Sequence, residues 1–412
     1  MKVSIERHPL DRVSLSLIID DSTALVNLNY FFLRQCEEYL GKRQRWEDIP
    51  VVHPESFTRE FGEWCAETGV KGKFSIVPCP AGIGRIDQGL PMVSPAQLDS
   101  WLAMCRETIV PSFDITPEMM THTFVVDLET FQPVDPTLWE QWGWDQLPVE
   151  DEDLIVRYIE TACRILDNVG LTPAGVTSPG GFGNPLDVFA RCAQEALRRV
   201  TPNPVPYLFK RISRERVETP VWFPDVDAGT ALGEAIACTG DWTGSWTGYG
   251  DADADRYISA DLNGGRLPEV IDAGDPAILI SHWQGFYGMH NEDRRGFHTL
   301  KTVADRLRQR DPYGEHTRWR KCSDITRYAC AREMAAVEAA DGRIIVDAPV
   351  SVDDLTLGIS DCDVAGIEVD GVPLRPVCRR ADFASGTLWK DGGRTLAAFD
   401  VAQRQHVLTV FS

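Results

Sequence analysis

The sequence predicts an α/β fold, a parallel (β/α) barrel followed by a small antiparallel β-sandwich. Three observations lead to this prediction. Apolar, strand-like runs alternate with amphipathic, helix-like runs over most of the 412 residues, as in parallel α/β proteins. Polar residues that could do chemistry follow directly after the apolar runs, and a (β/α) barrel builds its active site at the carboxyl ends of its strands. Near residue 335 the pattern changes to short alternating runs.

The strands and helices of the barrel are predicted from local patterns. Short apolar runs that end in polar residues indicate buried parallel strands, which we expect in residues 13–19, 71–80, 119–128, the start of 171–185, and 276–285. Between them, apolar residues recur at helical spacing and glycine ends several of the segments. We expect these helices in residues 25–40, 57–69, 95–109, 151–170, 187–200 and 299–310.

The sequence pattern in the last part of the chain predicts β-hairpins. Its short runs are separated by Asp-Gly and Gly-Gly pairs, which favour tight turns between antiparallel strands. We therefore expect two domains, a barrel over residues 1–335 and a β-sandwich over residues 336–412.

Composition excludes several classes of partner. A formal net charge of −21 disfavours nucleic acid and anionic membrane surfaces, which both select for basic proteins. No apolar run approaches the roughly 18 residues that a membrane span requires. The N-terminus lacks a secretory pattern, and the 11 cysteines are scattered singly, so we expect a reducing, cytoplasmic location. The oligomeric state is left open, and a homodimer is among the alternatives.

Four polar residues at predicted strand ends are candidates for chemistry. Asp20 and Asp21 end the first strand, where adjacent side chains diverge, so that one carboxylate can bind a metal while the other acts as a base. A solvated turn is the alternative interpretation, with about equal weight. His122 lies in the third predicted strand region, although a lone histidine is more often structural. His282 directly follows the apolar run 277–281, and its ring is expected in the barrel mouth.

Several loop residues are candidates for contact with a substrate. The Gly-Gly pair of the TSPGG stretch lets backbone approach a ligand closely. The loop 239–257 is rich in Gly, Trp and Asp, a composition typical of binding loops. Tryptophan stacks on sugar rings, although packing accounts for about half of such residues. The predicted substrate contacts are Arg85, Pro179, Gly180, Asp241, Trp242, Trp246, Trp283 and Gln284.

Taken in order, the stretches SLIIDD, HTFVV, TSPGG and ILISH resemble the motifs of the polysaccharide deacetylase superfamily, the NodB-homology domain. The resemblance covers roughly residues 10–300 and leaves out the C-terminal region. Two positions depart from the family pattern. Val126 stands where a further histidine is expected, and Thr177 stands where the family has an arginine.

The resemblance implies a distorted (β/α)7-type barrel and metal-dependent removal of acyl groups from amino sugars. It implies that Asp20 is the general base and His282 the general acid, with Asp21 and His122 as metal ligands. The metal would be divalent zinc, nickel or cobalt. Because Val126 replaces the second histidine, a site without metal also stays open, as does a site that His290 or His298 completes.

The prediction from the sequence is a carbohydrate-active hydrolase, with N- or O-deacetylation of a soluble sugar or oligosaccharide as the first reading. One alternative is a glycoside hydrolase, in which Asp20 or Asp21 pairs with Asp241 or Asp87 across the cleft. The other is a non-catalytic sugar-binding protein.

Overall fold

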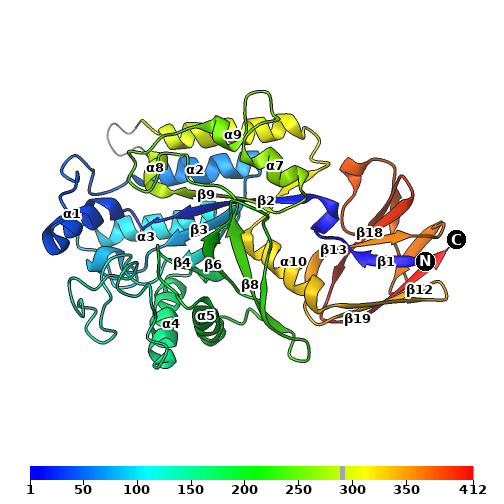
Figure 1. Ribbon diagram of the computed structural model, residues 1–412, viewed down its shortest axis with the longest axis horizontal. Helices are drawn as coiled ribbons and strands as arrows, with labels where there is room; N and C mark the ends of the chain where they lie inside the picture. Colours follow the sequence, from blue (N-terminus) through cyan, green and yellow to red (C-terminus); the bar gives the residue numbers. More distant parts are fainter. Residues whose placement is uncertain (288–292, 412) are drawn as a thin grey trace.

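The computed structural model describes residues 1–287 and 293–411. Helices and parallel strands alternate through most of the chain, and antiparallel strands make up its last part. In Figure 1 the helix-rich part lies on the left and the antiparallel strands lie on the right, where both chain ends are found. The α/β architecture predicted from the alternating pattern is confirmed.

The parallel strands form two sheets. In the first, β9 (Ala277–His282), β2 (Val13–Asp20), β3 (Gly72–Ile76) and β4 (Phe113–Pro117) run side by side, and β10 (Thr317–Trp319) pairs with the start of β2. In the second, β5 (Gly175–Thr177), β6 (Tyr207–Ile212) and β8 (Thr230–Ala237) are parallel, and β7 (Val221–Asp225) is antiparallel to β8.

The two sheets meet at two places. Glu118, just after β4, forms a parallel bridge with Thr177 at the end of β5. On the other side, the backbone N–H of Cys238 after β8 donates to the carbonyl of Ile278 in β9 at 2.7 Å. Strand β2 lies in the middle of the first sheet and is almost wholly buried, which explains its near-continuous apolar sequence.

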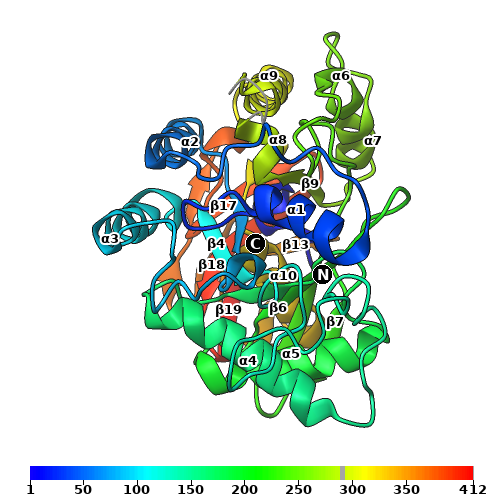
Figure 2. The ribbon, with the colours of Figure 1, turned by 90° about the vertical axis from the view of Figure 1, so that its left-hand side faces the viewer.

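Helices lie around these strands. They are α1 (Leu28–Leu40), α2 (Glu55–Thr68), α3 (Pro95–Met104), α4 (Glu152–Asn168), α5 (Leu186–Val200), α6 (Ala254–Tyr257), α7 (Arg266–Asp272), α8 (Trp283–Tyr287), α9 (Arg295–Arg310) and α10 (Cys322–Met334). Figure 2 shows α9, α2, α3, α4 and α5 arranged around the parallel strands. Local signals set several helix ends: Asn27 caps α1 and Gly41 ends it in the left-handed conformation, and Ser94 and Gln97 form a capping box at α3.

The C-terminal strands form two further five-stranded sheets that share a hydrophobic core. One sheet contains β1 (Lys2–Ile5), β13 (Val352–Ser360), β18 (Arg394–Val401), β17 (Thr387–Asp391) and β16 (Arg375–Val377). The other contains β11 (Ala336–Ala340), β12 (Arg343–Ala348), β19 (Arg404–Phe411), β14 (Gly366–Val369) and β15 (Val372–Pro373). The first strand of the chain, β1, pairs with β13, so the N-terminal residues join this region. The division at residue 335 stays a prediction.

One strand was predicted in the wrong place. The strand expected at residues 119–128 is β4, at Phe113–Pro117, and residues 119–128 form an irregular loop that is buried as far as Val126. The apolar run Phe124–Val126 supports this loop through isolated bridges to Trp139 and Pro133. A short apolar run does not distinguish a buried loop from a strand.

No helix in the described ranges is both long enough and apolar enough to span a membrane.

Candidate active site

A cavity of about 350 Å³ opens at the carboxyl ends of the parallel strands. Its polar lining contains Asp20, Asp21, Glu118, His122 and His282, and its apolar lining includes Phe32, Trp142, Phe209 and Trp246. The strand ends thus bring together the predicted catalytic and metal-binding residues, although the chain separates Asp20 from His282 by more than 250 positions.

The two adjacent aspartates face different neighbours. Strand β2 ends at Asp20, and Asp21 adopts the left-handed conformation with φ of 61°, which aspartate tolerates better than most residues. The carboxylate of Asp20 forms an ion pair with Lys73, whereas that of Asp21 lies 2.8 Å from Nε2 of His122. The two carboxylates therefore lie in different environments, as the divergence of adjacent side chains at a strand end predicts.

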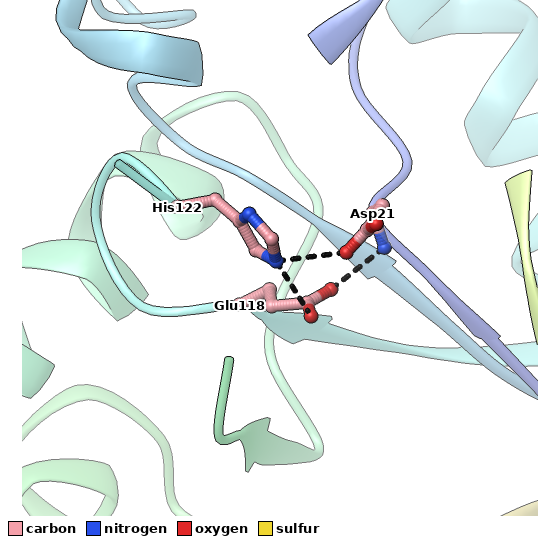
Figure 3. Close-up of side chains that lie close together, drawn as sticks. All are labelled: Asp21, Glu118 and His122. Carbon is pink, nitrogen blue, oxygen red and sulfur yellow. Dashed lines mark hydrogen bonds and ion pairs between the residues drawn. The ribbon is translucent and has the colours of Figure 1, made fainter. Parts of the chain in front are cut away.

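Asp21, Glu118 and His122 form a compact cluster (Figure 3). The Nε2 atom of His122 lies 2.8 Å from Asp21 Oδ1 and 3.3 Å from Glu118 Oε1. The other carboxylate oxygen of Glu118 accepts hydrogen bonds from the Asp21 backbone N–H at 2.8 Å and from the Ser75 hydroxyl at 2.5 Å. Within the described part of the chain, the ligand atoms of these three buried residues all lie within 4.8 Å of one another.

Glu118 is a candidate metal ligand that the sequence analysis missed. We looked for a third ligand at position 126, four residues after His122, but Val126 is buried in the loop core. The structure offers Glu118 instead, four residues before His122 and directly after β4. Placing the strand at 119–128 concealed this position, because the first residue past the true strand end is Glu118.

The cluster fits a divalent metal. Burial disfavours a charged imidazole, but Asp21 and Glu118 outweigh this effect and raise the pKa of His122 well above its ordinary value. The cluster therefore attracts positive charge. Two carboxylates and one imidazole leave a position open for water, as catalytic zinc sites do with three protein ligands.

Gln141 supplies a second observation that fits a metal. Its amide nitrogen lies 3.1 Å from Nδ1 of His122, and its buried Oε1 has no hydrogen-bond partner. A histidine that binds metal through Nε2 carries its proton on Nδ1 and donates it to an outer acceptor. Turning the Gln141 amide by half a rotation would bring Oε1 to Nδ1 of His122 and give it that partner.

Lys73 stands beside Asp20. Its side chain is fully buried; besides the ion pair with Asp20, it donates to the Thr177 hydroxyl at 2.7 Å. Burial raises the pKa of Asp20, and the attraction of Lys73 opposes this shift only in part. Thr177 stands where the motif that it resembles has an arginine. It therefore lies next to a different cation, the ammonium group of Lys73 on strand β3. The sequence analysis did not single out Lys73.

His282 ends β9, directly opposite Asp20 of β2 in the strand register. Its Nδ1 lies 2.7 Å from Oδ2 of Asp241, and Oδ1 of Asp241 accepts hydrogen bonds from the backbone and hydroxyl of Thr243. Burial lowers the pKa of His282, but the carboxylates of Asp21, Asp241 and Asp20 outweigh it and raise that pKa to about 10. His282 is therefore protonated at neutral pH.

Glu140 supports the loop that carries His122. Its buried carboxylate accepts hydrogen bonds from three consecutive backbone N–H groups, those of Met120, Thr121 and His122, at 3.2, 3.0 and 2.7 Å. It also accepts one from the Tyr158 hydroxyl at 2.6 Å. Burial raises the pKa of Glu140 to about 7.

We expect Glu140→Gln to destabilise the fold by about 1–3 kcal/mol, because an amide NH₂ group cannot accept from these donors and leaves buried groups unpaired. Urea unfolding measures the change. Glu129→Gln, on the exposed surface of the same segment, is the control and should stay within about 0.5 kcal/mol of wild type. If Glu140→Gln and Glu129→Gln were equally stable, Glu140 would not stabilise the loop that carries His122.

Gly180, in the TSPGG loop, lines the cavity and lies against Gln141. It has φ of 50°, and a Cβ atom there would lie 2.9 Å from Cβ of Gln141. Pro179, its neighbour, is not among the lining residues. The close contact explains why glycine occupies this position next to the residue that orients His122.

Gly180→Ala should therefore displace Gln141 and cost about 1–3 kcal/mol of stability through overpacking. Gly41→Ala is a matched control, because Gly41 has φ of 65° but nothing within 4 Å of the added Cβ. Thermal unfolding of both variants separates the backbone strain, which they share, from the contact with Gln141. A larger loss in the Gly41 variant would argue against the contact.

Other predicted substrate contacts lie away from the cavity. Trp283 is 1% exposed and packs among Phe57, Phe61 and Phe74. Gln284 is buried too, and its amide donates to the Asp21 carbonyl at 3.1 Å. Trp283 follows an apolar strand, and its aromatic surface contributes to the core rather than to the cavity wall.

Trp242 and Arg85 are also held elsewhere. Trp242 packs against Tyr257 and lies under the guanidinium of Arg256. Arg85 forms an ion pair with Asp87 and lies over the ring of Phe131. Of the predicted tryptophans only Trp246, 40% exposed, lines the cavity. His298 is exposed on α9, and His290 lies outside the described residues.

Comparisons with known proteins give distant similarities. No family model matches the chain, and no curated protein matches it. Among solved structures, a probable polysaccharide deacetylase from Pseudomonas aeruginosa is similar at 11% identity and a TM-score of 0.41, over 77% of this chain and 91% of that one.

Two other solved structures are similar to a comparable degree. A PuuE allantoinase shows 13% identity and a TM-score of 0.39, over 77% of this chain and 89% of that one. A glycoside hydrolase family 30 xylanase from Clostridium acetobutylicum shows 8% identity and a TM-score of 0.32 over the full length of both chains.

Proposed function

We propose that this protein is a hydrolase that removes an acyl group from a soluble sugar with the help of a divalent metal. One observation carries the proposal: a single cavity holds the Asp21–Glu118–His122 cluster together with a carboxylate, Asp20, and a protonated imidazole, His282. These are the parts that hydrolysis of an amide or ester requires.

Each part has a distinct role. Asp20 is the general base that takes a proton from the attacking water, and Oδ2 is the oxygen we assign to this task because Lys73 binds Oδ1. His282 is the general acid for the leaving group. Asp241 holds its Nδ1, so Nε2 delivers the proton. Asp21, Glu118 and His122 would hold the metal, which supplies carbonyl polarisation and a more acidic water when bound.

The walls of the cavity support a sugar as substrate. Phe32, Trp142 and Trp246 present aromatic surface beside the polar strand ends, and sugar-binding sites combine flat apolar faces with a few fixed polar groups. The cavity volume of about 350 Å³ suits a small ligand. N- or O-deacetylation of a soluble sugar is therefore the reaction that we favour.

The two junctions between the parallel sheets support a closed barrel. Through them, β2, β3, β4, β5, β6, β8 and β9 follow one another in a circuit. We infer a distorted (β/α)7-type barrel, with the two C-terminal sheets as an appended β-sandwich. The site then lies at the carboxyl ends of the strands, where such barrels bind substrates.

The glycosidase alternative has less support. It requires a carboxylic acid and a carboxylate facing each other across the cleft. Asp241 has both oxygens engaged, and its pKa is lowered, because His282 and Thr243 outweigh the effect of burial. It therefore stays ionised and cannot act as the acid, and it is not among the residues that line the cavity, so it does not serve as the carboxylate either. Asp87, the other candidate partner, is paired with Arg85 and does not line the cavity.

Metal analysis tests the proposal directly. We expect near-stoichiometric zinc, nickel or cobalt in the wild-type protein by elemental mass spectrometry, and its loss in Glu118→Ala and His122→Ala. Glu129→Ala, an exposed glutamate of the same segment, should retain the metal. The loaded protein should release acetate from a panel of N-acetyl and O-acetyl sugars. Wild-type protein without metal, or metal that both ligand variants retain, would overturn the proposal.

A further inference from the structure

We propose that Lys73 is a positioning residue that assigns different tasks to the two adjacent aspartates, because its ammonium group keeps Asp20 out of the metal ligand set. This inference rests on the proposed function, since it assumes that Asp21, Glu118 and His122 bind a metal. It adds a reason why only one member of the Asp20–Asp21 pair does so.

The starting observation is an asymmetry between neighbours. Asp20 and Asp21 are both about 5% exposed and both line the same cavity. The compact set of possible metal ligands nevertheless contains Asp21 and leaves Asp20 out. Strand alternation turns the two side chains apart, but both reach the cavity, so alternation alone does not decide which carboxylate a cation takes.

The strand register explains how Lys73 reaches Asp20. Lys73 of β3 lies directly opposite Ile18 of β2. Since side chains two residues apart in a strand share a face, Asp20 lies on the same face as Ile18 and one step toward the cavity. A lysine side chain is long enough to cover this step, and its ammonium group pairs with Oδ1 of Asp20.

The ammonium group of Lys73 is held firmly. It is fully buried and donates to the Thr177 hydroxyl at 2.7 Å, which in turn lies 2.8 Å from the Thr116 hydroxyl. The ring of Phe209 lies below it, with its centroid 4.9 Å from Nζ. A buried ammonium without a carboxylate partner would cost several kcal/mol, so Lys73 and Asp20 hold each other in place.

This pairing separates the electrostatic environments of the two aspartates. The fixed positive charge of Lys73, paired with Asp20, repels an approaching cation, and the repulsion is strong at short range in a buried site. Asp21 instead faces Glu118 and His122, with no lysine or arginine among the contacts of its carboxylate in the described residues. The cation is therefore directed to Asp21, and Asp20 keeps an oxygen free to accept a proton.

Cobalt titration tests this assignment. We would follow Co²⁺ binding by visible absorption in the wild type, Lys73→Met, Lys73→Arg and the control Lys71→Met, whose side chain lies by a different pocket at the opposite ends of the strands. In Lys73→Met we expect Co²⁺ to bind about tenfold tighter, with a changed spectrum as Asp20 joins the ligands. Turnover of acetyl sugars should fall by about 100-fold. Lys73→Arg and Lys71→Met should keep the wild-type spectrum.

A second variant keeps the test decisive if Lys73→Met is poorly folded. The double variant Lys73→Met with Asp20→Asn has no ionised carboxylate at position 20 that is left without a partner or that could join the cobalt ligands. It should therefore fold and show the wild-type cobalt spectrum. Wild-type affinity and spectrum in Lys73→Met would overturn the role of Lys73 and leave the proposed function intact. A wild-type protein that binds no Co²⁺ would overturn the metal site, and with it both proposals.

Discussion

Replacing Asp20 by asparagine should lower turnover by about 10²–10⁴-fold, the usual contribution of a general base, and leave the metal content unchanged. Asparagine has nearly the shape of aspartate, and its amide oxygen can still accept from Lys73. It cannot take a proton from water. Asp20 lies outside the ligand set, so the metal should remain.

The measurement combines kcat on an acetyl sugar that the wild type hydrolyses with elemental analysis of the same preparations. Asp127→Asn is the control, because Asp127 is exposed and its carboxylate accepts hydrogen bonds from Glu129 and Thr130 within its own turn. An Asp20→Asn protein that loses its metal would show that Asp20 is a ligand. One that retains full turnover would show that the base is another group.

Replacing Asp241 by asparagine should move the basic limb of the pH–rate profile to lower pH by about 1–3 units, the effect of removing one close opposite charge. A general acid works only when protonated, so the rate falls as pH rises through the pKa of His282. The carboxylates of Asp21, Asp241 and Asp20 raise that pKa. A metal bound by Asp21 would offset its share, whereas Asp241 stays in direct contact with Nδ1 of His282. Removing its charge lowers the pKa, and the rate then falls at a lower pH.

The profile of kcat/KM against pH, recorded on the metal-loaded protein, measures this shift. Asp251→Asn removes an exposed carboxylate from the same loop and should leave the profile in place. An unchanged profile in Asp241→Asn, or a limb that moves to higher pH, would mean that His282 is not the acid. His282→Gln should remove the limb altogether.

Local patterns were sufficient for the polar residues at two strand ends. Asp20 ends an eight-residue strand that is otherwise near-continuously apolar, and His282 ends an equally clear run. Glu118 was missed because β4 is short and contains an aspartate and a proline, so a more apolar stretch downstream was taken for the strand. Trp283 was misplaced because an aromatic residue next to polar ones looks the same in the sequence whether it lines a cavity or fills the core.

The sequence by itself determined the alternation of strands and helices, the hairpins of the C-terminal part, and the aspartate pair and histidine at strand ends, because these depend on neighbouring residues. The tertiary structure alone decided the partners. Lys73 reaches Asp20 across 53 positions, Glu118 reaches Asp21 across 97, and Asp241 reaches His282 across 41. Such contacts depend on which strands lie side by side and in what register. Hydrophobic periodicity determines which face of a strand is buried, and it carries no information about the strand that lies next to it.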